Sequence, residues 1–210
     1  TALAVVFAVL FVFSAVNLFL TIADYRQAEN LYNDVQEQYV SIRTTESSAL
    51  QNTEKPKEEL ISVDFEGLLS ANPDVVGWVR IPDTKIDFPL MQGQDNDFYL
   101  THQFDKSPSR AGCLFVDMVN DAAFSDPNTI IYGHYTKDRS MFYELRGYKQ
   151  QDFFDAHPTG WLITPSAAYK LQFFSGYVSD VYGNAWDTDF TEKDYAEWLT
   201  ARKTKSVFAA

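Results

Sequence analysis

The sequence is poor in cysteine and in positive charge. Cys113 is its only cysteine, so no disulfide can form within these 210 residues. Lys and Arg number 17 against 29 Asp and Glu, which gives a formal net charge of −12. Because phosphate binding requires clustered Lys and Arg, this balance argues against nucleic acid as a partner.

The sequence also lacks Cys and His groups with metal-ligand spacing, and it has no glycine-rich phosphate loop. We therefore expect neither a metal nor a cofactor. Aromatic residues, in contrast, make up 16% of the chain. They provide enough large apolar side chains for the core on which a fold without disulfides depends.

The first 23 residues carry no charge, and Asn17 is their only strongly polar side chain. As a helix they span roughly 33 Å, which is enough to cross the hydrocarbon core of a bilayer. A cleaved signal peptide is the alternative, but Asp24-Tyr-Arg-Gln follows in place of a small-residue cleavage site. We expect residues 1–23 to be an uncleaved transmembrane anchor.

Beyond the anchor, apolar side chains recur at alternating spacings of three and four, at Tyr25, Ala28, Tyr32, Val35, Tyr39 and Ile42. This spacing predicts a stalk helix over residues 24–43 with one apolar seam. The seam can pack on the chain's own domain, which we favour, or form a dimer. Residues 44–60, rich in Thr, Ser, Glu and Lys, are predicted to be a flexible linker.

Residues 61–210 then form the main domain. Short β-prone runs predict strands at 75–81, 86–90, 113–116, 129–132, 161–164 and 169–178, and helical patterns lie at 63–70, 141–148 and after Thr191. Pro89 suggests an edge position for its strand. Thr191 and Asp194 resemble a capping box, with Tyr195, Trp198 and Leu199 on the buried face of the last helix. Many short strands without a βαβ rhythm indicate a mixed barrel that is mainly β, with helices.

His134 is the most suggestive single residue. It follows the predicted strand 129–132 and Gly133, which allows the backbone to bend or to approach another group closely. A histidine at the mouth of a strand is well placed to meet a substrate. The alternative is a structural histidine that is hydrogen-bonded at a strand end, which is how we interpret His102 and His157.

Several blocks around His134 resemble one family. They are Gly77-Trp78-x-x-Ile81-Pro82, residues 94–100, Ile131-Tyr-Gly-His134, Asp152-Phe-Phe154, His157-Pro158 and residues 169–175. In this order they resemble class B sortases, the membrane-anchored cysteine transpeptidases of Gram-positive bacteria, over about residues 63–206. The resemblance implies a closed sortase-type β-barrel with extra helices, attached to the cell membrane by a single span and exposed on the extracellular face.

The resemblance also implies an activity and a site. A sortase cleaves the C-terminal sorting signal of a surface protein after Thr and joins the protein to an amine of the peptidoglycan precursor. His134 matches the catalytic histidine of the family. Asn96, Leu100, Tyr132 and Tyr195 are the corresponding candidates for substrate binding, although each is equally compatible with a structural role. Tyr135 follows the histidine where many members of the family have Asn.

The family's other two catalytic groups are not found in the sequence. Its nucleophilic Cys ends a Thr-Leu-x-Thr-Cys strand and its Arg lies on the next strand, both after the final helix, so we expect them and two further barrel strands beyond Ala210. Cys113 lies in an apolar run and is expected to be a core residue rather than a replacement nucleophile. As written, the chain is not expected to complete the reaction. The alternative function is an inactive, membrane-tethered β-barrel that binds peptide or cell-wall polymer, and a third is a hydrolase that depends on Cys113.

Overall fold

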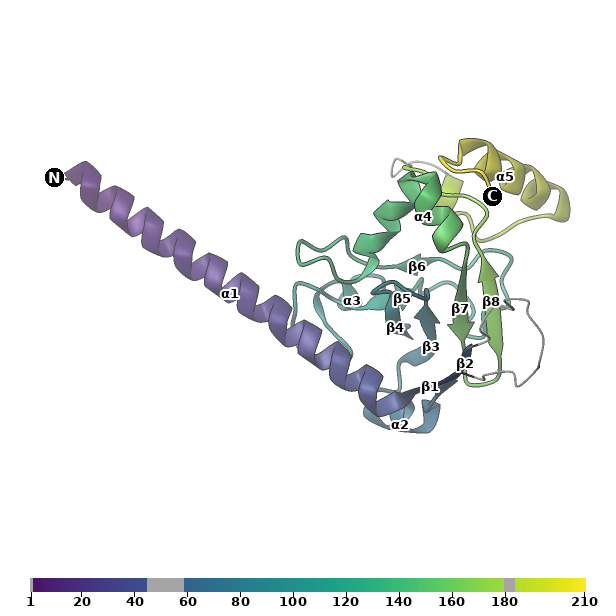
Figure 1. The fold of residues 1–210 in the computed structure, drawn as a ribbon, viewed down its shortest axis with the longest axis horizontal. Helices are drawn as coiled ribbons and strands as arrows, with labels where there is room; N and C mark the ends of the chain where they lie inside the picture. Colours follow the sequence, from purple (N-terminus) through teal and green to yellow (C-terminus); the bar gives the residue numbers. More distant parts are fainter. Residues whose placement is uncertain (1, 45–58, 180–183) are drawn as a thin grey trace, which may run out of the picture.

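The computed structural model describes residues 2–44, 59–179 and 184–210. Its main domain is built on a six-stranded sheet, and a long helix, α1 (Ala2–Tyr39), extends from one side of it (Figure 1). The strands of this sheet are β3 (Val75–Arg80), β4 (Asp87–Met91), β5 (Leu114–Val116), β6 (Ile131–Tyr132), β7 (Thr159–Ile163) and β8 (Ala168–Gln172). A separate antiparallel pair is formed by β1 (Val40–Thr44) and β2 (Glu59–Val63).

The strand order in the larger sheet is β6-β5-β4-β3-β7-β8. All neighbouring strands are antiparallel except β4 and β5, which are parallel. Within the described residues, β6 and β8 are free edges that do not pair with each other. The sheet is therefore curled but open, a half-barrel, and the closed barrel expected from the sequence is not present in this part of the chain.

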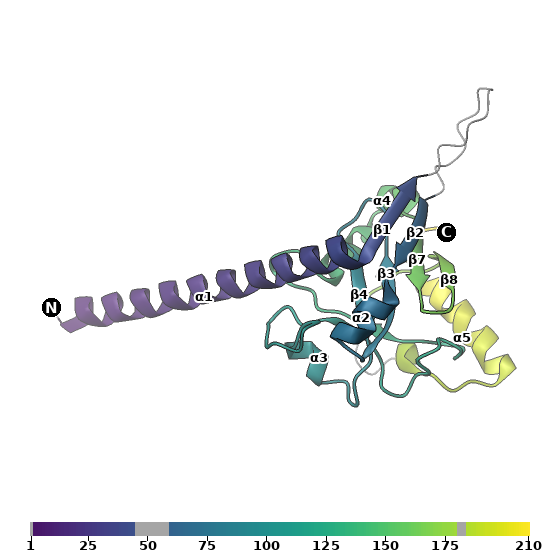
Figure 2. The same ribbon diagram turned by 90° about the horizontal axis from the view of Figure 1, so that it is seen from below.

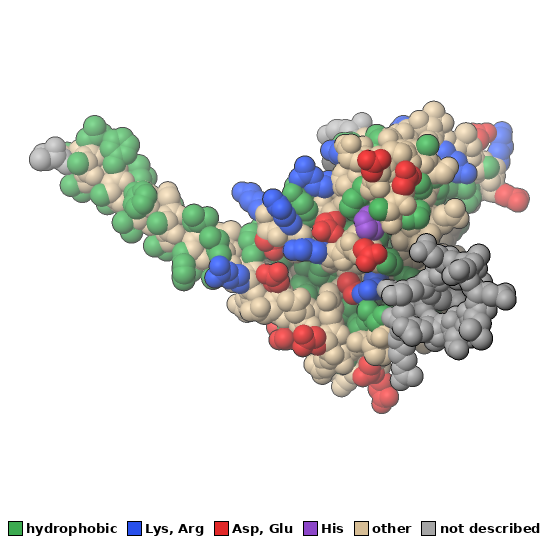
Figure 3. All heavy atoms as spheres, viewed as in Figure 1, with side chains coloured by type: hydrophobic (Ala, Val, Ile, Leu, Met, Phe, Trp, Pro, Cys, Tyr) green, Lys and Arg blue, Asp and Glu red, His purple; other side chains and the backbone are tan. Residues whose placement is uncertain are grey.

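Helix α1 is continuous and has two different surfaces along its length. Its first half exposes large apolar side chains from Leu3 to Ile22, which form the green rod in Figure 3. Among the described helices it is the one long and apolar enough to cross a membrane. This property fits the predicted anchor.

The second half of α1 packs on the domain through the predicted seam. Ala28, Tyr32 and Val35 are buried, and the Tyr32 ring meets Phe88 of β4 edge-on at 5.2 Å. The Gln36 side-chain amide donates a hydrogen bond to the carbonyl of Asp87, at 2.5 Å. The stalk is thus part of the domain's core rather than a free spacer.

The stalk helix is shorter than predicted. It ends at Tyr39 instead of residue 43, and Ile42 pairs with Ile61 across β1 and β2 instead of continuing the helical seam. Val40, Ile42 and Thr44 are β-branched, which favours the extended conformation once a partner strand is available. The predicted linker 44–60 is also shorter, because Thr44, Glu59 and Leu60 lie in these strands, and residues 45–58 are outside the described residues.

Strand β4 lies inside the sheet, between β3 and β5, so the predicted edge position is wrong. Pro89, which has no N–H to donate, is tolerated because the ladder with β5 begins only at Leu90. On the other side, β3 supplies the buried Trp78, whose indole N–H donates to Asp87 Oδ1 at 2.6 Å. Asp87 also forms an ion pair with Arg80. The centre of the sheet therefore combines apolar packing with one partly buried charged pair.

The described helices of the domain are short, apart from the last. They are α2 (Phe65–Ala71), α3 (Phe98–Thr101), α4 (Gln151–Ala156) and α5 (Glu192–Lys205), with 3₁₀ helices η1 (Phe142–Lys149) and η2 (Asn184–Trp186). Helices α1 and α5 lie on opposite sides of the sheet (Figure 1 and Figure 2). Thr191 caps α5 as predicted and accepts a hydrogen bond from the Asp194 N–H at 3.3 Å.

Three details of these elements differ from prediction. Residues 142–149 form a 3₁₀ helix rather than an α-helix, and it begins one residue later than predicted because Met141 has a φ of 52°. Strand β8 ends at Gln172 rather than residue 178, because β7 begins only at Thr159 and offers no partner beyond that point. The inner face of α5 is only partly buried at the three predicted positions, and its one buried residue is Arg202.

We predict that Leu90→Ala lowers the free energy of unfolding by about 2–5 kcal/mol, because Leu90 is fully buried in the middle of the sheet. The measurement is urea unfolding of the full chain in detergent micelles, followed by tryptophan fluorescence. Leu69→Ala is the matched control. Leu69 on α2 is 38% exposed, and its loss should change the free energy by no more than about 0.5 kcal/mol.

Candidate functional site

His134 lies directly beyond the edge strand β6, where the backbone is tightly enclosed. Tyr132 pairs with Phe115 of β5, and Gly133 follows. A Cβ on Gly133 would lie 2.3 Å from Leu114 and 2.5 Å from Phe142, so no other residue fits there without movement. The His134 carbonyl then accepts a hydrogen bond from the Phe142 N–H, at 3.1 Å. This bond and the glycine fix the backbone that carries the imidazole.

The imidazole is held by a backbone carbonyl. His134 Nε2 lies 2.6 Å from the carbonyl oxygen of Leu100, in the segment that follows β4. Because a carbonyl oxygen only accepts, we assign the ring proton to Nε2. The Nδ1 atom is then the one that can take up and release a proton. His134 as a whole is partly exposed.

A second polar cluster lies beside β6 and connects two of the predicted site residues. The Tyr132 hydroxyl donates to Asp117 Oδ2 at 2.7 Å. Asn96 accepts a hydrogen bond from the Met118 N–H at 2.8 Å, and its side chain also interacts with Asp117. Asp117 is the common partner. It directly follows β5 and is buried.

The charges in this cluster are stabilised by hydrogen bonds. Burial by itself would raise the pKa of Asp117, but hydrogen bonds from the Val119 N–H, Tyr132 and Asn96 hold that pKa below its usual range. The pKa of Tyr132 is raised, first by burial and then by the Asp117 carboxylate. At neutral pH the pair is therefore a carboxylate that accepts from a neutral phenol.

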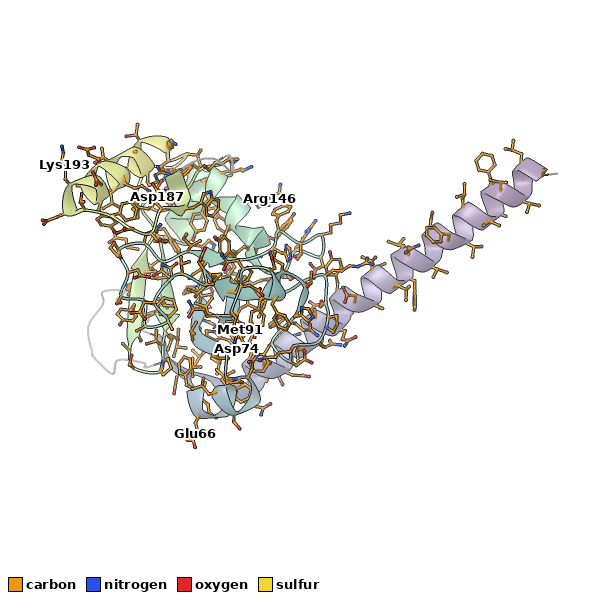
Figure 4. The ribbon with its side chains drawn as sticks, turned by 180° about the vertical axis from the view of Figure 1, so that it is seen from behind. Glu66, Asp74, Met91, Arg146, Asp187 and Lys193 are labelled. Atoms are coloured by element: carbon orange, nitrogen blue, oxygen red, sulfur yellow. The ribbon has the colours of Figure 1, made fainter. Side chains whose placement is uncertain are left out.

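The segment before α5 covers the same strand. The Tyr132 ring stacks on Trp186 of η2, with ring centroids 5.9 Å apart. The Asn128 side-chain amide donates to the Asp187 carbonyl at 2.8 Å. Figure 4 shows Asp187 and Arg146 of η1 at the same end of the domain, opposite Glu66 of α2. This end of the sheet, with β6 at its edge, carries the candidate site.

The contacts thus join four of the five predicted site residues in two separate pairs. Leu100 contacts His134 through its carbonyl, and Asn96 contacts Tyr132 through Asp117. Tyr195 lies on α5, where its ring packs against Phe190 and Trp198, at 5.5 and 6.0 Å. Its contacts do not join it to the other four.

Sequence reasoning did not single out Asp117 or Trp186. Asp117 could have been found, because it is an acidic residue directly after the buried strand that contains Leu114 to Val116. Trp186 carries no such signal. Its contact with Tyr132 joins residues far apart in the sequence, and no local pattern encodes that contact.

Cys113 is a core residue, as its apolar neighbours suggest. It directly precedes β5, is 1% exposed, and burial raises the pKa of its thiol to about 12. The other two histidines bind structural partners. His102 stacks on Phe98 at 4.0 Å, and His157 Nδ1 lies 3.1 Å from the Pro82 carbonyl. Over residues 2–44, 59–179 and 184–210, no group of three His, Cys, Asp or Glu side chains could hold a metal ion.

An apolar groove of about 610 Å³ is lined in part by residues of η1. Its lining includes Leu145, Tyr148, Phe173, Val178 and Phe208. None of the predicted site residues contributes to it. The groove is therefore a feature separate from the His134 cluster.

The chain is similar to two curated sortases. It is 40% identical over 148 residues to Sortase B of Listeria monocytogenes, a match that covers 70% of this chain and 60% of the relative. It is 35% identical over 151 residues to Sortase B of Staphylococcus aureus, covering 71% of this chain and 62% of the relative. The chain thus spans about 60% of the length of these curated relatives. No protein-family model matches it.

Solved structures give the same result. A sortase B from Bacillus anthracis in complex with AAEK1 superimposes with a TM-score of 0.75 at 30% identity, covering 90% of this chain and 84% of that one. A Staphylococcus aureus sortase B–substrate complex superimposes with a TM-score of 0.68 at 35% identity, covering 70% of this chain and 68% of that one. The likeness therefore extends from the sequence to the arrangement of the strands.

We predict that Tyr132→Phe lowers the free energy of unfolding by about 1.5–3 kcal/mol at pH 7, because it removes a hydrogen bond to a carboxylate. The folded-state pKa of Asp117 lies below the unfolded value of about 3.9, so its contribution is complete above that value and is lost as the pH falls through the folded-state pKa. The difference between variant and parent should therefore shrink below about pH 4.

The measurement for Tyr132→Phe is urea unfolding across this pH range. Tyr135→Phe is the matched control, since Tyr135 is 62% exposed and its hydroxyl accepts only from the exposed Arg146. A difference between Tyr132→Phe and the parent that stays constant down to pH 3 would contradict the role of Asp117.

We also predict that Cys113 resists alkylation by iodoacetamide at pH 8 in the folded protein and reacts once the protein is unfolded in urea. Its burial and raised pKa leave almost no exposed thiolate. Intact-mass spectrometry provides the readout. Rapid labelling of the folded chain would revive the hypothesis of a hydrolase that depends on Cys113.

Proposed function

Since the chain belongs to the class B sortase family, we propose that it works as a cysteine transpeptidase with His134 as its acid and base. Its substrate is a surface protein that carries a C-terminal sorting signal. The enzyme cleaves this signal after Thr and joins the new end to an amine of the peptidoglycan precursor. The family membership supports the type of reaction, and the geometry around His134 supports its role as the acid and base.

The observation that carries this proposal is the hydrogen bond between His134 Nε2 and the Leu100 carbonyl. It fixes the ring orientation and leaves Nδ1 to exchange protons. When a thiolate attacks the Thr carbonyl of the signal, the departing amine needs a proton, which an imidazolium can donate from Nδ1. The neutral ring then takes a proton from the attacking peptidoglycan amine, and a second acyl transfer releases the product.

The proposed reaction also needs a nucleophilic thiolate near His134. Cys113 is unsuitable, because it is buried and its pKa is raised to about 12. Strand β6 pairs with β5 on one side only among the described residues, so its other edge can accept a further strand beside His134. A cysteine at the end of such a strand, with an arginine on the next one, would complete the catalytic group.

The peptide is proposed to bind next to His134. Asn96, Leu100 and Tyr132 lie around the end of β6, where their backbone and side-chain polar groups can orient an extended peptide. Tyr195 would contribute from α5. The Asp117 carboxylate holds the Asn96 and Tyr132 side chains in place through their hydrogen bonds.

The anchor determines where this reaction takes place. Helix α1 is long and apolar enough to span a bilayer, and its second half is docked to the domain. We place the domain on the extracellular face, where surface proteins meet the peptidoglycan precursor.

We predict that His134→Ala reduces transpeptidation by at least 10²-fold, because it removes the group that transfers protons. The assay uses protein expressed from the complete reading frame, with a fluorogenic sorting peptide and an amine acceptor. His157→Gln is the control, since His157 binds the Pro82 carbonyl and should leave turnover close to that of the parent.

Two outcomes would contradict the proposed function. The first is a coding sequence beyond Ala210 that lacks a Thr-Leu-x-Thr-Cys strand followed by an Arg. The second is an intact protein that binds the sorting peptide without cleaving it, with binding unaffected by His134→Ala. That result would favour a membrane-tethered binding module.

A further inference from the structure

Tyr32, on the stalk part of α1, makes a polar contact deep inside the domain. It is 3% exposed, and its hydroxyl donates to the carbonyl of Gly112 at 2.7 Å. The same hydroxyl interacts with the Cys113 thiol. Burial, followed by the neighbouring Cys113, raises the pKa of Tyr32 well above its ordinary value, so the phenol stays protonated and keeps donating.

Gly112, whose carbonyl accepts the hydrogen bond from Tyr32, packs against both the Leu100 carbonyl and the His134 ring. Gly112 has a φ of 61°, and a Cβ there would lie 2.8 Å from the Leu100 carbonyl oxygen and 3.1 Å from His134 Cδ2. The next residue, Cys113, donates its N–H to the Tyr99 carbonyl at 3.0 Å. A displacement of Gly112 therefore changes the space available to both the Leu100 carbonyl and the imidazole.

These contacts form a short, continuous path from α1 to the imidazole. The hydroxyl of Tyr32 holds Gly112, Gly112 packs against Leu100 and the ring, and the Leu100 carbonyl binds the ring nitrogen at 2.6 Å. We infer that Tyr32 is a positioning residue for His134, so that the anchoring helix also sets the geometry of the candidate site. This inference rests on the proposed function of His134.

The same path connects the site to the membrane. Tyr32 lies eight residues after Asp24, which is about 12 Å along the continuous helix. Two residues before Gly112, the Arg110 N–H donates to Asp24 Oδ2 at 3.0 Å, and the Arg110 guanidinium binds the Thr21 hydroxyl. The loop that supports the imidazole is thus tied to α1 at two levels.

The test removes one hydroxyl and leaves the packing in place. The full chain, labelled with ¹⁵N-histidine and reconstituted in lipid nanodiscs, is compared with Tyr32→Phe by long-range ¹H–¹⁵N spectra of the imidazoles. These spectra report which ring nitrogen carries the proton. The chain has 3 histidines, so His102 and His157 serve as internal references.

In Tyr32→Phe we expect the His134 ring signals to move and the fraction of the Nε2–H tautomer to fall, with His102 and His157 unchanged. Gln36→Met is the matched control. It also removes one hydrogen bond from α1 to a backbone carbonyl, that of Asp87, and should leave the His134 signals where they are. Unchanged His134 signals in Tyr32→Phe, or equal changes in both variants, would overturn the inference.

A kinetic measurement on the protein from the complete reading frame separates this inference from the proposed function. Tyr32→Phe should lower kcat by roughly 10-fold or more with KM unchanged, because a misplaced imidazole slows proton transfer without weakening peptide binding. If the parent shows no turnover, the proposed function fails while the spectra still decide the inference. If the parent turns over and the spectra do not respond, only the inference fails.

Discussion

The hydrogen bond between His134 and the Leu100 carbonyl is the contact around which the rest of the site is arranged. It joins the end of β6 to the segment that follows β4, and it requires both backbones to approach closely. Gly112 leaves room for this contact, since a Cβ there would lie 2.8 Å from the Leu100 carbonyl oxygen and 3.1 Å from His134 Cδ2, while Gly133 lets the end of β6 pack closely on Leu114 and Phe142. The chemistry attributed to His134 therefore depends on two positions that have no side chain at all.

The second constraint is the docking of α1. Its outer half exposes apolar side chains over a length that fits a membrane span, while its inner half buries Ala28, Tyr32 and Val35 against the domain. Because the helix is unbroken between these halves, the packing of the inner half fixes the direction in which the apolar half leaves the domain.

The open edge of the sheet lies next to the histidine that matches the catalytic histidine of the family. Strands β6 and β8 are the two edges of the described sheet, and His134 lies at the end of the first. Cys113 is unsuited to act as a nucleophile, because burial raises the pKa of its thiol to about 12. His134 is partly exposed at this open edge, and the hydrogen bonds among Asn96, Asp117 and Tyr132 lie beside the same strand.

Much of the local structure could be read from neighbouring residues. The uncharged run before Asp24 identified the apolar helix, the alternating three and four spacing identified the buried seam, and Thr191 with Asp194 identified the start of α5. The motif around His134 indicated the family, and the structure then paired His134 with Leu100 and Asn96 with Tyr132 through Asp117. In each case the signal is a periodicity, a cap or a short motif, and it lies within a few residues.

What the sequence did not determine depends on partners that are distant along the chain. The end of α1 at Tyr39 requires β2 as a partner for β1, and the central place of β4 requires β5 beyond the start of its ladder. The link from Asn96 through Asp117 to Tyr132, and the contact from Tyr32 to Gly112, likewise join separate segments. Side-chain patterns encode which face of an element is apolar, whereas the identity of the group that meets this face is decided only when the whole chain packs.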